Sequence, residues 1–302
     1  MKKAIFLLFV FSLLVYPMEV KLSGYSKFRF NWEESATPEE NFSAKDVRLM
    51  WTLGVNKISS LVVELNAIPS TAGVNSCYVK LKTKRGDLQF GQFKIPFGYE
   101  IPLPAALLET PDVATVLRSL FPKQTYDKGV MFSPNRNLRL ALINGNGEQQ
   151  VNDDNNYKDL IVRLSDEKGD FSYGASCYLG KQVAGTKDVV KNRYGVDLLW
   201  KKRRHSLRGE LVSGKDDRED SRGWYIQYRY DLPSVSYILR SEYYNGVQAY
   251  DVKKGEWNKT ESKALIFGPM FYLEKNTILS FIYTLQEGKK NDSFMMPIEL
   301  IY

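Results

Sequence analysis

Apolar and polar residues alternate with a period of two along most of the chain. Val20, Leu22, Phe28 and Trp32 fall on one side of the first such segment, with polar residues such as Lys21 between them. Successive side chains of a β-strand point to opposite faces, so this pattern predicts strands with one apolar and one polar face. A tilted strand needs about 9–11 residues to cross a bilayer, a length that the first segment reaches.

The alternating segments predict about sixteen strands. They are residues 19–32, 46–56, 60–67, 75–84, 86–95, 128–133, 137–144, 157–164, 171–180, 191–200, 205–213, 223–230, 234–244, 263–273, 276–286 and 293–302.

The connections between these segments alternate in length and composition. The odd-numbered ones are long and mostly acidic or rich in Asn and Gly: 33–44, 68–74, 96–127, 145–156, 181–190, 214–222, 245–262 and 287–292. The even-numbered ones are tight, as at Arg85 or Pro134-Asn135-Arg136. Transmembrane barrels have short periplasmic turns and longer external loops. The sequence therefore predicts an all-β, antiparallel transmembrane β-barrel with both termini on the periplasmic side.

The amino-terminal residues predict export. Met1-Lys2-Lys3 precedes an apolar run from Ala4 to Tyr16, which is typical of a secretory signal peptide. We expect residues 1–18 to be the signal peptide and residues 19–302 to form a single barrel domain in the bacterial outer membrane. After the signal no apolar run is long enough for a transmembrane helix. Cys77 and Cys177 are expected to be small outward-facing residues rather than a disulfide.

The last strand ends on an aromatic residue. Phe294, Met296, Ile298 and Leu300 alternate with other residues up to the terminal Tyr302. Bacterial outer-membrane barrels generally end on such a strand, and the similarity supports the same class of fold.

Bases outnumber acids on the predicted inward faces. A sixteen-stranded barrel is wide enough to hold a water channel, and cationic side chains that line a channel favour anions. The predicted pore-lining and anion-binding residues are Lys27, Arg29, Arg48, Lys80, Lys82, Lys94, Arg118, Lys123, Lys128, Arg139, Arg163, Arg193, Arg208, Arg229 and Arg240. Alternatively, these bases pair with inward-facing acids or with lipopolysaccharide phosphates and give the channel no preference for anions.

The third external connection is the longest and the least regular. Its apolar residues, among them those of Pro102–Leu108 and Val113–Leu120, need somewhere to pack. We expect this loop to fold into the lumen and to set its narrowest point, with Lys94, Arg118, Lys123 and Lys128 near the constriction.

Gly91-Gln92-Phe93-Lys94-Ile95-Pro96-Phe97-Gly98-Tyr99-Glu100 resembles the signature of the phosphate-selective porin O and P family. Asp127-Lys128-Gly129-Val130 and Asn144-Gly145-Asn146-Gly147 resemble two further parts of it. The resemblance implies a trimeric sixteen-stranded barrel with an arginine-lined entrance, a narrow anion site, and phosphate or related anions as cargo. One departure is that Arg118 is the single arginine between Lys94 and Lys128.

Other functions stay open. A general or sugar-selective porin would use Tyr25, Tyr78, Tyr178 and Tyr225, which are predicted to face the lumen. A barrel enzyme would need partners for His205, the one histidine, which falls near a predicted periplasmic turn. A soluble exported adhesin is the third alternative. We expect no catalytic residue, cofactor, metal site or nucleic-acid partner; the expected partners are small anions, outer-membrane lipid, lipopolysaccharide and two further copies of the chain.

Overall fold

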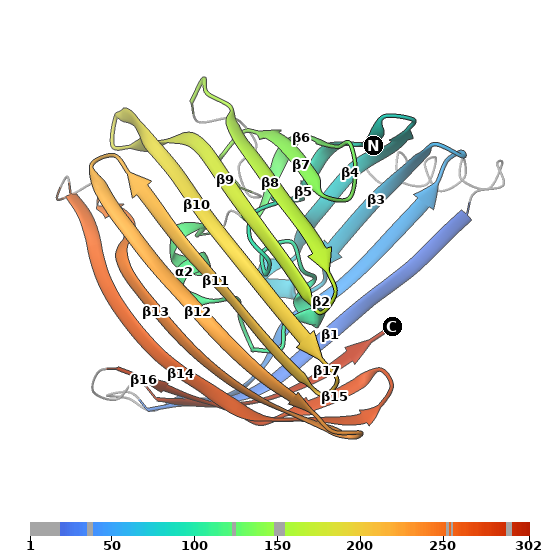
Figure 1. The fold of residues 1–302 in the computed structure, drawn as a ribbon, viewed down its shortest axis with the longest axis vertical. Helices are drawn as coiled ribbons and strands as arrows, with labels where there is room; N and C mark the ends of the chain where they lie inside the picture. Colours follow the sequence, from blue (N-terminus) through green and yellow to red (C-terminus); the bar gives the residue numbers. More distant parts are fainter. Residues whose placement is uncertain are drawn as a thin grey trace.

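A computed structural model describes residues 19–34, 39–122, 125–147, 155–251, 254, 256–287 and 292–302. Almost all of them lie in one antiparallel sheet (Figure 1). Its strands are β1 (Glu19–Glu33), β2 (Glu39–Gly54), β3 (Ser59–Asn66), β4 (Gly73–Thr83), β5 (Gly86–Lys94), β6 (Tyr126–Ser133), β7 (Leu138–Ile143), β8 (Asp159–Lys168), β9 (Phe171–Ala184), β10 (Lys187–Lys202), β11 (His205–Asp216), β12 (Glu219–Asp231), β13 (Val235–Asp251), β14 (Glu256–Glu274), β15 (Thr277–Ser280), β16 (Ile282–Gln286) and β17 (Ser293–Ile301). Among the described residues, three short helices lie between strands: η1 (Pro69–Thr71), η2 (Ala105–Leu107) and α2 (Thr115–Leu120).

The sheet closes on itself into a barrel. Each strand pairs with its neighbours in the chain, and β1 pairs with β17 as well as with β2. β15 and β16 both pair with β14 and β17, and Phe281 between them donates a backbone hydrogen bond to Pro269 O at 2.9 Å. They are therefore two halves of one wall strand, and the barrel has 16 strands. The predicted fold class is confirmed.

The two ends of the barrel differ. We call the end that carries connections 55–58, 84–85, 134–137, 169–170, 203–204, 232–234 and 275–276 the turn end. The first and last strands also meet there, since the backbones of Gly24 and Tyr302 exchange hydrogen bonds of 2.6 and 3.0 Å. The opposite end, which carries the connection between β5 and β6, is the loop end.

Several predicted loops are too long. Strands include residues 39–44 of the first predicted loop and most of the predicted loops 181–190, 214–222 and 245–262. Only two residues join β9 to β10, and only two join β11 to β12. The strand that was predicted over 276–286 is interrupted at Phe281. Alternation marks the part of a strand with one apolar and one polar face, whereas ladder hydrogen bonds continue beyond it through residues that do not alternate in this way. The pattern therefore underestimates strand length at the loop end.

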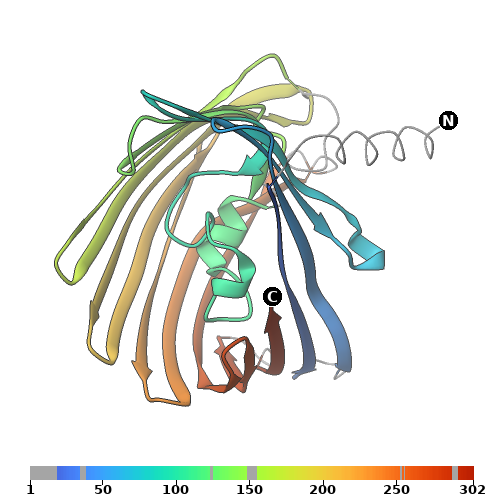
Figure 2. The same ribbon diagram turned by 90° about the vertical axis from the view of Figure 1, so that its right-hand side faces the viewer.

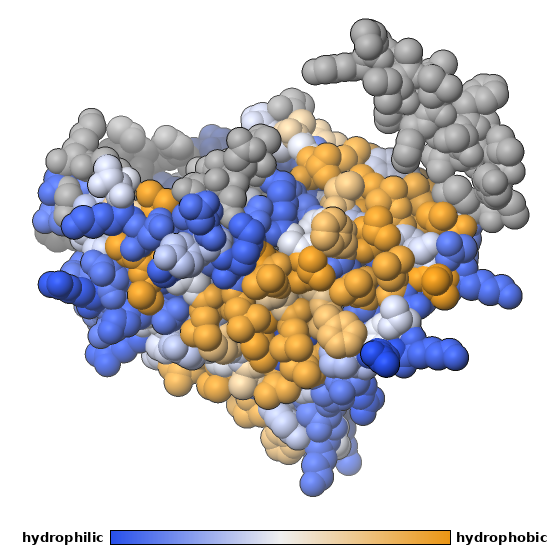
Figure 3. Space-filling model, turned by 90° about the horizontal axis from the view of Figure 1, so that it is seen from above, coloured by the Kyte–Doolittle hydropathy of each residue, from blue (hydrophilic) through white to orange (hydrophobic). Residues whose placement is uncertain are grey.

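The two faces of the wall differ in polarity. Along β10 to β13 the outward positions carry exposed apolar side chains, including Val196, Leu198, Leu211, Trp224, Ile226 and Leu239. Figure 3 shows a broad apolar face flanked by hydrophilic residues. The inward positions between them carry buried polar side chains such as Asp197, Arg208 and Arg240. This arrangement is the one expected of a barrel that has lipid outside and polar groups inside. In the described part of the chain no helix is long and apolar enough to cross a membrane.

The two cysteines are not bonded to one another. Cys77 is exposed and Cys177 is half-buried, and both are free thiols. The prediction that they form no disulfide is confirmed.

Candidate functional site

The chain between β5 and β6 contacts several strands of the wall. We call its described part, residues 95–122, the β5–β6 segment; it includes η2 and α2. Its helix α2 contacts β11, β12 and β13, and in Figure 2 this helix and the turns before it are drawn between the flanking walls. All the wall residues that it touches in the contacts below lie on inward faces.

Apolar side chains hold the segment against the wall. Phe97 packs on Phe121 with ring centroids 4.8 Å apart, and Phe121 packs on Tyr178 of β9 at 5.7 Å. Phe97, Phe121 and Leu117 are buried almost completely. Burying a side chain of this size stabilises by about 1.5–3 kcal/mol, so the cluster alone favours the attached conformation.

Small residues in the wall leave room for this cluster. A Cβ atom on Gly195 would lie 3.1 Å from Phe97, one on Gly214 would lie 2.7 Å from Leu120, and one on Gly223 would lie 2.8 Å from Val116. These glycines occur on the inward faces of β10, β11 and β12. The wall is therefore shaped to receive the apolar residues of the segment.

A sharp turn at Gly98 begins the segment. Gly98 has a φ of +63°, which an L-residue adopts only with strain. Its N–H donates to Ser176 Oγ at 3.0 Å, and the N–H groups of Tyr99 and Glu100 donate to the Glu210 carboxylate at 3.0 and 2.9 Å. The turn thus presents three successive backbone donors to wall acceptors.

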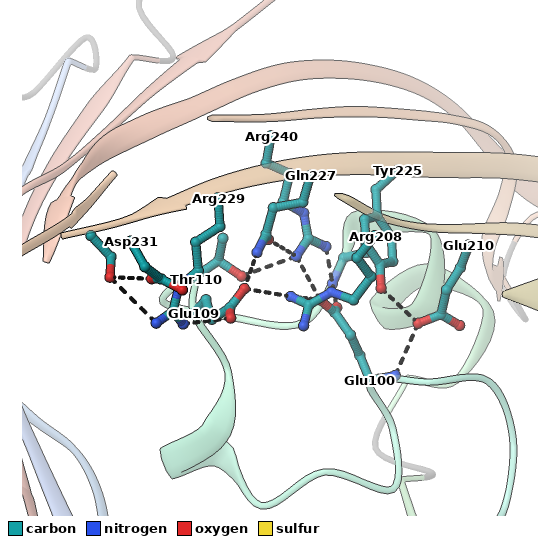
Figure 4. Close-up of polar contacts among 12 residues, drawn as sticks. Glu100, Glu109, Thr110, Arg208, Glu210, Tyr225, Gln227, Arg229, Asp231 and Arg240 are labelled. Atoms are coloured by element: carbon teal, nitrogen blue, oxygen red, sulfur yellow. Dashed lines mark hydrogen bonds and ion pairs between the residues drawn. The ribbon is translucent and has the colours of Figure 1, made fainter. Parts of the chain in front are cut away.

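Ion pairs fix the middle of the segment to three arginines of the wall (Figure 4). Arg240 Nη1 lies 2.7 Å from Glu100 Oε1, and Arg208 Nη2 lies 3.4 Å from the same oxygen. Glu109 lies 3.2 Å from Arg208 and 2.6 Å from Arg229. Two acids of the segment therefore occupy three bases that were predicted to bind anions.

The protonation state of Glu100 follows from these neighbours. Burial alone would raise its pKa, but the guanidinium groups of Arg240 and Arg208 and the N–H of Ala114 outweigh burial, so the pKa lies below the ordinary glutamate value. Glu100 is therefore ionised at neutral pH, and its negative charge compensates the positive charges of Arg240 and Arg208.

A wall carboxylate caps α2. The N-cap residue Ala114 has no side-chain oxygen, and Glu242 of β13 accepts hydrogen bonds from the N–H of Thr115 at 2.9 Å and from its hydroxyl at 2.6 Å. Arg240 Nε lies 2.6 Å from Glu242 Oε1, although this N–H does not point at the oxygen. Acceptors at a helix N-terminus satisfy backbone donors that the helix leaves unpaired.

A third acid of the segment faces other strands of the wall. Asp112 lies 2.8 Å from Lys45 of β2, 3.8 Å from Arg29 of β1 and 4.0 Å from Arg118 of α2. Burial would raise the pKa of Asp112, but these cations hold it below the ordinary aspartate value. The segment is thus linked by charge to β1 and β2 as well as to β11–β13.

Two large cavities lie along the β5–β6 segment, and a smaller one of about 120 Å³ is lined by its Tyr99 and Glu109 together with β10–β12. The turn-end cavity, of about 860 Å³, is lined by β1–β7, the connection 134–136 and residues 93–107 of the chain. The loop-end cavity, of about 480 Å³, is lined by β1, β14, β16, β17 and residues 110–118. Cationic side chains outnumber carboxylates in the turn-end cavity: Arg48, Lys80, Lys94, Arg136 and Arg139 against Glu64 and Asp87. The loop-end cavity is mixed, with Arg29, Lys45 and Arg118 among Glu33, Glu34, Asp112 and Glu242.

The predicted pore-lining bases fall into groups. Many are ion-paired with acids: Lys27 with Glu299 (2.7 Å), Arg48 with Asp46 (2.8 Å), Lys80 with Asp87 (2.7 Å), Arg163 with Asp197 (2.7 Å), Arg193 with Asp216 (2.7 Å), and Arg208, Arg229 and Arg240 as above. Arg29 and Arg118 lie near Asp112. Lys94 contacts Leu103 O and lies 5.3 Å from the Tyr126 ring centroid. Arg139 and Lys128 are half-buried, and Lys82 is exposed. Lys123 lies outside the described residues.

Pairing therefore accounts for most of the deeply buried bases, as the alternative interpretation of the sequence allowed. The residues that the sequence interpretation missed are the acids Glu100, Glu109 and Asp112, together with Lys45 and Arg136. Lys45 sits at a bulge where β1 and β2 change register, between the pairs Lys27↔Asp46 and Phe28↔Ala44, so strict alternation does not place it.

The remaining candidate groups are arranged as follows. Tyr25 and Tyr78 line the turn-end cavity, whereas Tyr178 and Tyr225 are buried in the apolar cluster that includes the β5–β6 segment. His205 lies exposed at the turn end, and its Nδ1 is 2.6 Å from the Tyr228 hydroxyl. Among the described residues no group of three or more His, Cys, Asp or Glu side chains is arranged to hold a metal ion.

Comparison with solved structures places the fold among outer-membrane porins. An anion-selective porin from Comamonas acidovorans matches with a TM-score of 0.73 at 10% identity, over 94% of this chain and 100% of that chain. OmpF of Salmonella typhi in complex with daunomycin matches with a TM-score of 0.71 at 11% identity, over 94% and 97%. A loop L8 deletion mutant of OmpT, an outer-membrane protein of Vibrio cholerae, matches with a TM-score of 0.68 at 13% identity, over 95% and 100%.

The chain has the porin fold. At these identities the likeness is one of fold alone. No protein-family model matches the sequence, and no curated protein matches it. The phosphate-selective family that the sequence resembles is therefore not confirmed.

Proposed function

We propose that this protein is a bacterial outer-membrane porin whose water-filled channel prefers anions. The observation that carries the proposal is the pair of cavities along the β5–β6 segment, inside a closed barrel with a polar inward face. A continuous passage would run from the loop-end cavity to the turn-end cavity past the face of the segment that carries Asp112.

The β5–β6 segment acts, in this proposal, as a loop folded into the lumen that sets the narrowest point. Its attachment to β9–β13 through Phe121, Glu100 and Glu109 supports this role, because the attachment leaves the side of β1–β7 open for passage. Lys45, Arg29 and Arg118 would face a solute at the point where the two cavities approach one another.

Charge supports the anion preference. Cationic side chains that line a water-filled passage between low-dielectric walls raise the local concentration of anions. The preference is assigned to the turn-end cavity, because the bases on the β11–β13 side are already paired with Glu100 and Glu109. Phosphate or a related anion is the cargo suggested by the sequence resemblance, and one neighbour of the same fold is described as anion-selective.

Planar bilayers test the channel directly. Refolded protein should produce stepwise conductance in potassium chloride, and added phosphate should reduce the chloride current if the passage has a phosphate site. Absence of any conductance, with a protein that is extracted by plain buffer and shows no heat-dependent shift in gel mobility, would instead favour a soluble exported β-protein.

A sugar-selective or general porin is the second candidate function. Tyr25 and Tyr78, which line the turn-end cavity, are the observation that favours it. Liposomes that contain the protein would then swell in neutral sugars as fast as in salts of small anions. A barrel enzyme has no comparable support, since His205 contacts Tyr228 and lies at the turn end.

Assembly and location are part of the proposal. A neighbour of the same fold is described in a trimer form, and the exposed apolar wall fits a lipid environment. We propose a homotrimer in the outer membrane, exported by the amino-terminal signal and in contact with lipopolysaccharide at the loop end. Cross-linking in detergent should give a species of three chains.

A further inference from the structure

The turn-end cavity has an apolar surface that inorganic anions would not use. Leu107, at the end of η2, is 56% exposed, and Pro104 before it is exposed as well. The other large apolar side chains of the β5–β6 segment, such as Phe97, Ile101 and Leu117, are buried. Residues 102–107, which we call the apolar tip, therefore present hydrophobic surface to the cavity rather than to the wall.

Some wall residues that line the cavity are apolar as well. Met50, Val62, Phe93 and Met131 from four wall strands contribute to it. In the barrel interior, where inward positions are mostly polar, such a set of side chains is unusual. An apolar body placed in the cavity would therefore find apolar residues of the wall as well as those of the apolar tip.

Arg139 of β7 supplies a cation without a counter-charge at the same cavity. It pairs in register with Arg163 of β8, so two like charges face each other across neighbouring strands. Arg163 is neutralised by Asp197 through two hydrogen bonds of 2.7 and 3.0 Å. In the part of the chain that the structure describes, no carboxylate lies within ion-pair distance of Arg139. An anionic ligand would complete this arrangement.

Arg48 of β2 offers a second incomplete donor. It is held by Asp46 at 2.8 Å, but its Nη1 is buried, lies 3.7 Å from Glu64, and makes no hydrogen bond within the described residues. A guanidinium group of this kind matches the geometry of a carboxylate.

We propose that the turn-end cavity is a binding site for amphipathic organic anions, in which a carboxylate is held by Arg139 or Arg48 and an aromatic or short alkyl body lies against the apolar tip. The inference rests on the proposed channel function and names its substrate class. The cavity volume of about 860 Å³ falls within the range of about 300–1,000 Å³ that is typical of small-molecule sites. Inorganic phosphate would contact the cationic side chains but would not bury the apolar surface.

Equilibrium dialysis of the full-length protein in detergent measures binding without the need for conduction. The probes are radiolabelled benzoate, acetate, inorganic phosphate and benzyl alcohol, which separate the contributions of charge and apolar body. Benzoate should bind at least about tenfold more tightly than acetate, because burial of its ring adds hydrophobic free energy that acetate lacks. It should also bind more tightly than phosphate and benzyl alcohol.

Three variants locate the site. Leu107→Ser should weaken benzoate binding by about threefold to tenfold while leaving acetate unchanged, because it removes apolar contact alone. Arg139→Gln should weaken benzoate and acetate alike. Arg204→Gln, which changes an exposed arginine in the turn 203–204 and not in the cavity lining, is the matched control and should bind all probes as the unaltered chain does.

The outcomes separate this inference from the function on which it rests. Equal binding of benzoate, acetate and phosphate, or benzoate binding that is insensitive to both Leu107→Ser and Arg139→Gln, would overturn the amphipathic site even if the protein conducts anions. Tight benzoate binding in a protein that conducts no ions would support the site and contradict the porin. Phosphate binding that is tighter than that of benzoate would favour the inorganic cargo.

Discussion

Arg240 and Glu100 form an ion pair of 2.7 Å in which both side chains are fully buried, although 140 residues separate them in the chain. The pair joins a wall strand to the β5–β6 segment. In a buried ion pair the attraction between the two charges offsets the free energy that both groups lose on leaving water. Removal of one partner therefore leaves the other as a buried charge without compensation.

Loss of either partner should therefore loosen the segment. Glu100→Gln or Arg240→Gln is expected to destabilise its attachment by about 3–5 kcal/mol, while the strand pairing keeps the barrel closed. Urea unfolding in detergent measures the free energy, and limited proteolysis between β5 and β6 reports the release. In the double variant the two effects should not add; strict additivity would show that the pair does not couple segment and wall. Lys263→Gln, at an exposed ion pair with Glu287, is the control and should change neither measurement.

Acidification should release the segment as well. The pKa of Glu100 is lower in the folded protein than in the unfolded chain, so its contribution to stability is complete above the unfolded pKa and is lost as pH falls through the folded value. The same sign holds for Asp112 beside Lys45, Arg118 and Arg29. Current noise in a single channel should be low at neutral pH and should rise below about pH 4. A Glu100→Gln channel should be noisy both at neutral pH and below about pH 4. Current noise that does not change with pH in the unaltered protein would refute the role of Glu100 in holding the segment.

Gly98 should be intolerant of a side chain. A Cβ atom there would lie 2.3 Å from Glu210 Oε2, and the carboxylate cannot withdraw without losing the N–H groups of Tyr99 and Glu100. Gly169 has a similar φ of +61°, but no atom lies within 4 Å of a Cβ placed on it. Gly169→Ala should cost about 1–2 kcal/mol from backbone strain, and Gly98→Ala should cost more. Equal losses in urea unfolding would mean that the Glu210 contact has no energetic effect.

Asp112 should oppose the passage of anions. It is the carboxylate that Lys45, Arg29 and Arg118 surround at the loop-end cavity. One charge about 4 Å from a solute in water is worth about 1 kcal/mol, or about fivefold in local concentration. Asp112→Asn should raise the ratio of chloride to potassium permeability by up to about that factor. Asp170→Asn, at an exposed turn-end ion pair with Lys202, should leave the ratio unchanged. A fall in the ratio for Asp112→Asn would place the passage elsewhere.

Much of the wall was predictable from local pattern. An alternation of apolar and polar residues fixes which face of a strand meets lipid, and segments such as Val20–Trp32 show it without reference to any other part of the chain. The extensions of β9 to β14 at the loop end were not predictable in this way, because their residues do not alternate regularly between apolar and polar. The interruption at Phe281 was not predictable from the pattern either, and the register with β14 is the same on both sides of it.

The interior was harder to predict because its partners are distant in sequence. The bases Arg208, Arg229 and Arg240 were placed correctly on inward faces, but nothing near them indicated that Glu100 and Glu109 would neutralise them. Lys45 was assigned to no strand face, and the bulge beside it, which shifts the register of β1 and β2, could not be predicted from alternation. Charge excess on a wall therefore predicts where cations lie, and not which of them remain available to a solute.

Reversal potential across a planar bilayer under a potassium chloride gradient tests the central claim most directly. A channel lined by Arg48, Lys94 and Arg139 should show a reversal potential with the sign expected when chloride is more permeant than potassium. Arg139→Gln should move this reversal potential toward zero. A potential set by potassium in the unaltered protein would contradict the anion-preferring channel, and absence of conductance would contradict the porin itself.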